Sequence, residues 1–148
     1  MKKTFRIKAF IDTNVLVDYL IAFREKHDGA VNLFTLVFTT QIEAAFTTQS
    51  ILDAAYICRK YPGTETAAFR ETVRQLLDYA NTGAITLSTL SAALKDPDMD
   101  LEDSAQIAFA YEEACDVIIT HDRKLLSRPV PRPMQVMTPE EFLGKCYA

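Results

Sequence analysis

The chain has few of the residues that build disulfide frameworks and zinc sites, with three cysteines and two histidines among 148 residues. Cys58, Cys115 and Cys146 are odd in number, widely spaced and in no C-x-x-C pair, which argues against a disulfide framework and a cysteine zinc site. With only His27 and His121 available, the sequence also disfavours a histidine-rich zinc hydrolase. We expect reduced and mostly buried thiols.

Long apolar runs and glycine-rich phosphate loops are also missing. Arg6 and Lys8 interrupt the start of the chain, and no apolar stretch reaches the length of a signal-peptide core or a membrane span. We therefore expect a soluble, cytoplasmic protein with no membrane partner. No G-x-S-x-G motif occurs either, which argues against a serine hydrolase of that type. At 49% hydrophobic residues and with no linker or internal repeat, residues 1–148 are predicted to form a single domain.

The net charge of −4 bears on the kind of partner that the protein can bind. Nucleic-acid binding normally rests on a positive surface, so an acidic chain is at first sight a poor candidate. The objection weakens if several carboxylates share one pocket and bind one or two divalent cations, which would halve or cancel the net charge. The surface outside that pocket would then be near neutral or mildly basic.

Short apolar segments alternate with helical patterns along the whole chain. This alternation predicts an α/β fold with three layers, α/β/α, and a mainly parallel central sheet. In such a sheet, sites form where strands end and helices begin. Strands are expected over residues 7–11, 45–48, 85–87, 117–120 and 135–137. Helices are expected over residues 14–24, around 33–36, over 50–60 with Ser50 as the cap, from 64 to a stop at Gly83, over 88–95 and 101–114, and after a capping box at 138–141.

Four acidic residues fall where this arrangement places a site. Asp12 ends the first strand, Asp122 follows the strand at 117–120, Asp103 lies in the first turn of the preceding helix, and Asp53 lies in the first turn of its own helix. Mg²⁺ and Mn²⁺ prefer a few carboxylates together with waters and substrate oxygens. Asp12 carries most weight, because it directly follows apolar residues, where an unpaired charge is costly.

Each of the other acids also has an ordinary structural explanation. Asp53 can form a helix-capping pair with Ser50, and Asp100 and Asp103 both suit the positive end of a helix dipole. Asp122 can cap the turn that follows it. The functional interpretation therefore depends on the four acids together, at ends of strands and helices that converge.

Three segments together resemble a known family. Residues 10–18, Phe-Ile-Asp-Thr-Asn-Val-Leu-Val-Asp, resemble the opening of PIN domains, the nuclease fold of VapC-type toxins. Residues 100–108 followed by 116–122 are similar to the family's acidic helix, its final core strand and the Thr-x-Asp after it. Residues 138–143 are similar to the common family ending. The resemblance spans nearly the whole chain.

The resemblance implies a metal-dependent ribonuclease that leaves a 5′-phosphate and a 3′-hydroxyl. Its catalytic acids would be Asp12, Asp53, Asp103 and Asp122, with Mg²⁺ or Mn²⁺ held by Asp12, Asp103 and Asp122. Many relatives carry Glu in place of Asp53, which leaves its direct ligation open. The resemblance also implies a small antitoxin that inserts a basic residue into the acidic pocket, and a homodimer is compatible with it. Polar supports would be Thr13, Asn14, Asp100 and Thr120, and candidates for holding the RNA backbone are Arg59, Lys60, Arg123, Lys124, Arg128 and Arg132.

Three other functions are alternatives to the nuclease. A phosphoacceptor receiver domain needs Lys at the end of its last core strand, where this chain has Thr120 and His121. A haloacid-type phosphatase needs Asp-x-Asp after the first strand, and Asn14 takes the second place. A PIN fold kept only as an RNA- or protein-binding module stays open, because Asp53 and His121, where relatives often have Arg, depart from the family pattern.

Overall fold

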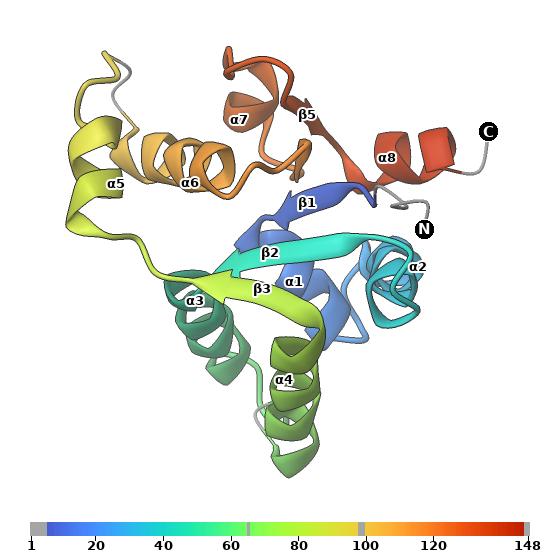
Figure 1. Cartoon of the computed structure of the whole chain (residues 1–148). Helices are drawn as coiled ribbons and strands as arrows, with labels where there is room; N and C mark the ends of the chain where they lie inside the picture. The colour runs from blue at the N-terminus through green and yellow to red at the C-terminus, as the bar shows by residue number, and fades with distance from the viewer. Residues whose placement is uncertain (1–5, 65, 98–99, 147–148) are drawn as a thin grey trace.

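Five strands form one parallel sheet in the computed structural model, which describes residues 6–64, 66–97 and 100–146. The strand order is β3-β2-β1-β4-β5 (Figure 1). The chain moves outward from β1 to β2 and β3, then returns to place β4 on the other side of β1. The strands within the described part of the chain are β1 (Lys8–Ile11), β2 (Glu43–Thr47), β3 (Ala80–Gly83), β4 (Val117–Ile119) and β5 (Gln135–Met137).

Both faces of the sheet are buried. Ala9 and Ile11 of β1 belong to one apolar cluster, whereas Phe10 between them belongs to a second cluster. Successive side chains of a strand point to opposite faces, so the three central strands are apolar at nearly every position. The prediction of a three-layer α/β/α fold is thereby confirmed.

Two groups of helices cover the two faces of the sheet. The larger group contributes buried residues to the cluster around Ala9 and Ile11, and the smaller group to the cluster around Phe10. The larger group is α1 (Thr13–Leu20), α2 (His27–Phe38), α3 (Thr48–Arg59), α4 (Ala67–Tyr79) and α8 (Pro139–Cys146). The smaller group is α6 (Leu101–Glu112) and α7 (Arg123–Ser127), with α5 (Leu87–Ala93) packed on α6. None of the described helices is long and apolar enough to cross a membrane.

The helix predicted over residues 14–24 is shorter than expected. It ends at Leu20, and the chain then turns so that Arg24 Nε donates to Asp18 Oδ1 at 2.7 Å. His27 Nδ1 lies 2.8 Å from the backbone oxygen of Asp18, a carbonyl in the last turn of the helix. These two side chains stabilise the end of α1 where the sequence offers neither Gly nor Pro.

The strand predicted over residues 85–87 is wrong, because β3 begins directly after α4 at Ala80. β3 lies at the edge of the sheet and is only partly buried, so it lacks the apolar alternation of a half-buried strand. Gly83 is part of this strand and does not stop a helix. A Cβ at Gly83 would lie 3.1 Å from the Phe109 ring, so glycine here permits the close approach of α6.

One predicted helix start is also corrected, and one helix was not predicted. Thr47 caps α3, because its Oγ1 accepts from Ser50 N at 2.9 Å, so Ser50 is not the cap and Asp53 is not its capping partner. The turn after Asp122 continues into α7, a helix that the sequence did not predict. The capping box of α8 is confirmed, since Glu141 N donates to Thr138 Oγ1 at 3.1 Å.

Candidate active site

Asp12 lies at the carboxyl end of β1, beside β4, where the strand order reverses direction. Open parallel sheets have their ligand sites at this point. Asp12 is 6% exposed, and both carboxylate oxygens accept hydrogen bonds, from Thr13 N at 2.7 Å and from Thr120 Oγ1 at 2.8 Å. The Thr120 hydroxyl also accepts from Asp122 N at 2.9 Å. One buried hydroxyl therefore fixes the acid after β1 and the backbone of the acid after β4.

Asp103 is the second buried acid of the site. It lies in the first turn of α6, whose N-cap Asp100 accepts from Asp103 N at 3.0 Å. Asp103 is 6% exposed, and its Oδ2 has no hydrogen-bond partner among the described residues. A buried carboxylate oxygen without a donor is costly, and a bound cation would remove that cost.

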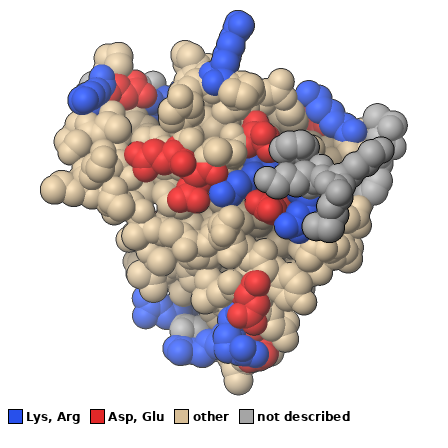
Figure 2. Space-filling view, viewed as in Figure 1, with Lys and Arg blue, Asp and Glu red and all other residues tan. Residues whose placement is uncertain are grey.

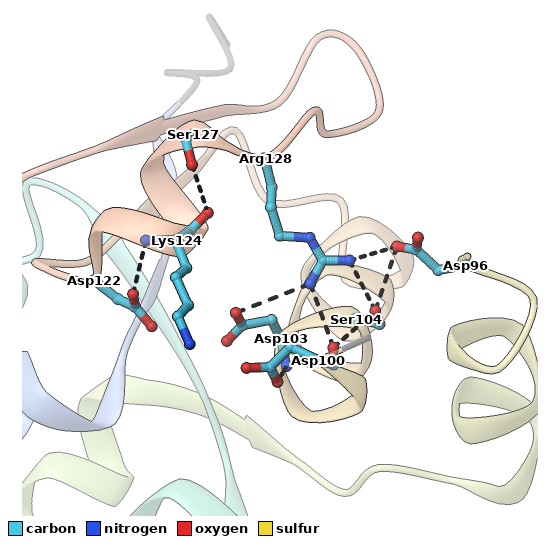
Figure 3. A network of polar contacts seen from close by, with 8 residues as sticks. All are labelled: Asp96, Asp100, Asp103, Ser104, Asp122, Lys124, Ser127 and Arg128. Carbon is cyan, nitrogen blue, oxygen red and sulfur yellow. Dashed lines mark hydrogen bonds and ion pairs between the residues drawn. The ribbon is translucent and has the colours of Figure 1, made fainter. Parts of the chain in front are cut away.

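Arg128 connects α7 to the start of α6, and its side chain is only 7% exposed. Figure 3 shows its guanidinium between Asp96, Ser104 and Asp103. Its Nη2 donates to Asp96 Oδ2 at 2.6 Å and to Ser104 Oγ at 2.8 Å, and its Nη1 lies 4.0 Å from Asp103 Oδ2. The expectation that Arg128 holds the RNA backbone is therefore wrong, because the group is engaged inside the protein.

The predicted acids line one cavity of about 470 Å³. Six carboxylates face it, and Lys60 is the one basic side chain among its described lining residues. Of the six, Glu102 was not singled out from the sequence. The lining residues are Asp12, Thr13, Asn14, Asp53, Tyr56, Ile57, Lys60, Asp100, Glu102, Asp103, Gln106 and Asp122.

Burial and neighbouring carboxylates raise the pKa values of three acids in the cavity. Burial raises the pKa of Asp12, and the hydrogen bonds from Thr120 and Thr13 only partly offset this effect. Burial, together with the charges of Asp100 and Asp122, raises the pKa of Asp103 to about 6. Burial also raises the pKa of Glu102, with a further contribution from Asp53. Asp12, Glu102 and Asp103 therefore hold protons more tightly than free carboxylates do, and a cation would compete for the same oxygens.

Raising the pH in chelator is expected to destabilise the wild type relative to Asp103→Asn. The pKa of Asp103 in the folded state, about 6, lies above its ordinary value of 3.8, so the folded state binds the proton more tightly than the unfolded state. The stabilisation of the folded state by this bound proton is complete below pH about 3.8 and is lost as the pH rises through about 6. Thermal melts of both proteins between pH 4 and 7.5 measure it. A difference in melting temperature that stays constant across this range would contradict the shift.

The donors of the cavity suit a hard divalent cation. Carboxylate oxygens dominate it, and Asp103 Oδ2 is buried without a hydrogen-bond donor. Within the described ranges, however, no three His, Cys, Asp or Glu groups are close enough to form a ready-made ligand cluster. The fit to a cation thus rests on the chemistry of the donors and on the unsatisfied oxygen of Asp103.

The remaining predicted residues differ in where the fold places them. Asp53 lies one turn further into α3 than expected, where its Oδ1 accepts from Gln49 Nε2 at 2.8 Å. Arg59 lines a separate hollow between α3 and α4, so of the pair Arg59 and Lys60 only Lys60 lines the acidic cavity. Arg123 and Lys124 are exposed on α7 and do not line the cavity.

His121 packs away from the cavity. Its Nε2 lies 3.8 Å from Asp18 Oδ2 and its Nδ1 lies 3.9 Å from Glu140 Oε2, on the side where α1 and α8 meet β4. At 25% side-chain exposure, His121 is a partly buried packing residue on that side.

Gln106 and Tyr56, like Glu102, are lining residues that the sequence argument missed, and it also missed the internal contacts of Arg128. Gln106 follows Asp103 by three residues on α6, and that spacing was a usable signal that the two share a face. Tyr56 stands in the same relation to Asp53 on α3. Arg128 gave no such signal, because its contacts join distant parts of the chain.

The fold and the sequence have clear relatives. The PIN domain family model matches residues 8–124. Ribonuclease VapC1 of Aquifex aeolicus (strain VF5) is 25% identical over 138 residues, which cover 91% of this chain and 92% of that protein.

Solved structures share the fold at low sequence identity. VapC20 of Mycobacterium tuberculosis, described as a sarcin-ricin loop cleaving toxin, has a TM-score of 0.66 and 12% identity over 83% of this chain and 96% of that one. A toxin-antitoxin complex from Klebsiella pneumoniae has a TM-score of 0.61 and 20% identity over 88% and 97% of the two chains. With the family model covering most of its length, this chain belongs to the PIN domain family.

Proposed function

We propose that this chain is a divalent-metal-dependent endoribonuclease that hydrolyses RNA phosphodiester bonds, and that it is the toxin of a VapC-type toxin-antitoxin pair. The main support is the cavity at the carboxyl ends of β1 and β4, where Asp103 keeps a buried carboxylate oxygen without a donor. Family membership and the similarity to a VapC ribonuclease over most of both chains support the same activity.

Asp12, Asp103 and Asp122 would hold the cation, Mg²⁺ or Mn²⁺, through their carboxylates. When bound, such a cation supplies Lewis acidity at the scissile phosphate and lowers the pKa of water beside it. Thr120 keeps the Asp12 carboxylate oriented, and the Asp12 side chain in turn accepts from Thr13 N. Asp53 is less buried than Asp12, and we assign it the role of accepting a proton from the attacking water at the cavity mouth.

The charge of the surface permits an RNA substrate. Figure 2 shows Lys and Arg side chains close beside the Asp and Glu side chains on the face drawn there. The acidic cavity itself would repel phosphate, so RNA binding at the acids depends on the cation. Lys60 lines the same cavity, and we assign it a contact with the RNA backbone.

Incubation with a single-stranded RNA is expected to give cleavage in millimolar Mn²⁺ and none in chelator. The physical reason is that six carboxylates without a cation repel the phosphate that must enter among them. Gel analysis of end-labelled RNA measures cleavage, and fluorescence anisotropy measures binding in chelator. RNA binding without cleavage in either condition would favour the alternative function, a PIN-fold binding module.

The same assay tests the proposed partner. Adding the product of the adjacent gene at equimolar ratio is expected to stop cleavage, if that product is the antitoxin. If cleavage persists and the two proteins form no complex, the nuclease activity stands and the toxin-antitoxin part of the proposal fails.

A further inference from the structure

One stripe of α3 runs from the acidic cavity outward. Asp53, Tyr56 and Lys60 are separated by three and four residues, which places them on one face of the helix. All three line the acidic cavity. At about 1.5 Å of rise per residue the stripe is about 10 Å long. An acid, an aromatic ring and a cation thus follow one another along a path that starts at the carboxylates.

Tyr56 is not placed for packing. Its side chain is among the exposed large hydrophobic groups, at 57% exposure, and among the described residues it packs against no other ring. Two cations flank the ring instead, with Lys60 Nζ at 4.8 Å and Arg59 Cζ at 5.6 Å from its centroid. Cations at these distances are attracted to the ring and restrict its orientation.

An exposed ring beside cations suits a nucleotide. Proteins that bind single-stranded nucleic acid combine a positively charged path for the backbone with aromatic rings on which bases stack. A base inside an A-form duplex is already stacked on its neighbours and does not offer its face to a protein ring. An acidic peptide would meet the cations but would leave the ring unused, so RNA is the better match to the whole stripe.

We propose that Tyr56 stacks on an unpaired base next to the scissile phosphate while Lys60 holds the adjoining backbone phosphate. The substrate is then single-stranded at the cut. This inference rests on the proposed function, since it uses the carboxylates at the inner end of the stripe as the point of cleavage.

The test uses Tyr56→Ala, Tyr56→Phe and Tyr56→Trp, with Tyr111→Ala as the matched control. Tyr111 is also 57% exposed, but it lies on α6 and lines a different hollow, beside Pro129 and Val130. Tyr56→Ala is expected to raise the KM for a short single-stranded RNA about tenfold with a smaller change in kcat, within the range for loss of one stacked base. The Phe and Trp variants should stay near the wild type, as should Tyr111→Ala.

An RNA that lacks one base beside the cut gives the sharper readout. The wild type should bind one such abasic RNA about tenfold more weakly than the intact RNA, whereas Tyr56→Ala should bind the two RNAs equally. The proposal would be overturned if removing the base weakened binding to Tyr56→Ala as much as it weakens binding to the wild type. It would also be overturned if Tyr56→Ala and Tyr111→Ala raised the KM equally. A normal KM in Tyr56→Ala together with lost binding of the adjacent gene's product would overturn it too, and would assign the stripe to a protein partner.

Binding measurements separate this inference from the proposed function. The same variants are made in an Asp53→Asn background, which blocks the proposed proton acceptance but keeps the three acids that would hold the cation, and their Kd for the RNA is measured by anisotropy in Mn²⁺. If the wild type does not cleave but Tyr56→Ala still weakens binding and Tyr111→Ala does not, the nuclease proposal fails and the stacking site stands. Equal Kd values for Tyr56→Ala and its parent remove the stacking site whatever the activity.

Discussion

Asp12→Asn is expected to lower kcat for RNA cleavage by at least about a thousandfold, which corresponds to about 4 kcal/mol of lost transition-state stabilisation. The substitution keeps the shape of the side chain but removes the charge that would hold the cation. Its surroundings tolerate the change, because the Thr120 hydroxyl can rotate to accept from the new amide, and Thr13 N can still donate to an oxygen. Single-turnover cleavage in saturating Mn²⁺ is the measurement.

Thermal melts of the same variant separate a lost ligand from a lost fold. In chelator, Asp12→Asn should melt no lower than the wild type, since burial raises the pKa of Asp12 and its charge destabilises the folded state at neutral pH. In the wild type, cation at a hundredfold excess over its Kd should add about 2.7 kcal/mol of stability, and the variant should lose most of this gain. Full activity in purified Asp12→Asn would remove Asp12 from the mechanism.

Two of the acids were predictable because the signal for each is local. Asp12 directly follows the apolar strand β1 and Asp122 lies two residues beyond the loop start after the apolar strand β4, and the carboxyl ends of parallel strands meet at one edge of the sheet. No knowledge of side-chain packing is needed for that step. The position of Asp103 in the first turn of the preceding helix indicated that acid too, and the family resemblance then gave Asp53 a catalytic role that its position in the chain alone does not indicate.

What the sequence could not supply are contacts between distant segments. Arg128 resembles any other surface cation in the sequence, yet its pairing with Asp96 depends on how α7 ends and where the start of α6 lies. The sequence gives no signal for the edge strand β3 for a related reason. Its residues Asn81 and Thr82 pair with β2 through the backbone, and an edge strand of this kind needs no apolar alternation.

These distant contacts explain how so many like charges coexist in one cavity. The two most buried acids of the cavity have different surroundings. Asp12 accepts two hydrogen bonds. Asp103 has one oxygen without a hydrogen-bond donor among the described residues, and the Arg128 guanidinium lies 4.0 Å from it. Hydrogen bonds thus fix the Asp12 carboxylate at the end of the sheet. Asp103 instead keeps an oxygen that suits a cation. The difference in their surroundings predicts that Asp103 has little structural role beyond its charge.

Asp103→Asn is expected to be inactive and near native in stability, whereas Asp100→Asn should keep measurable cleavage. Asp103 is buried in the cavity with a carboxylate oxygen that no described group satisfies, so the amide removes a ligand and a costly charge together. Asp100 lines the same cavity, but it already accepts from Asp103 N as the N-cap of α6. Asn caps helices as well as Asp does, so Asp100→Asn should preserve the cap.

Asp100→Ala supplies the matched control, because it removes the cap and should cost about 1 kcal/mol of stability while cleavage persists. Single-turnover cleavage in saturating Mn²⁺ and circular dichroism melts are measured on all three variants. A loss of activity in Asp103→Asn that exceeds a hundredfold, without a lower melting temperature in chelator, distinguishes a cation ligand from a structural acid. An active Asp103→Asn beside an inactive Asp100→Asn would show instead that the acid one turn earlier, at the mouth of the cavity, binds the cation.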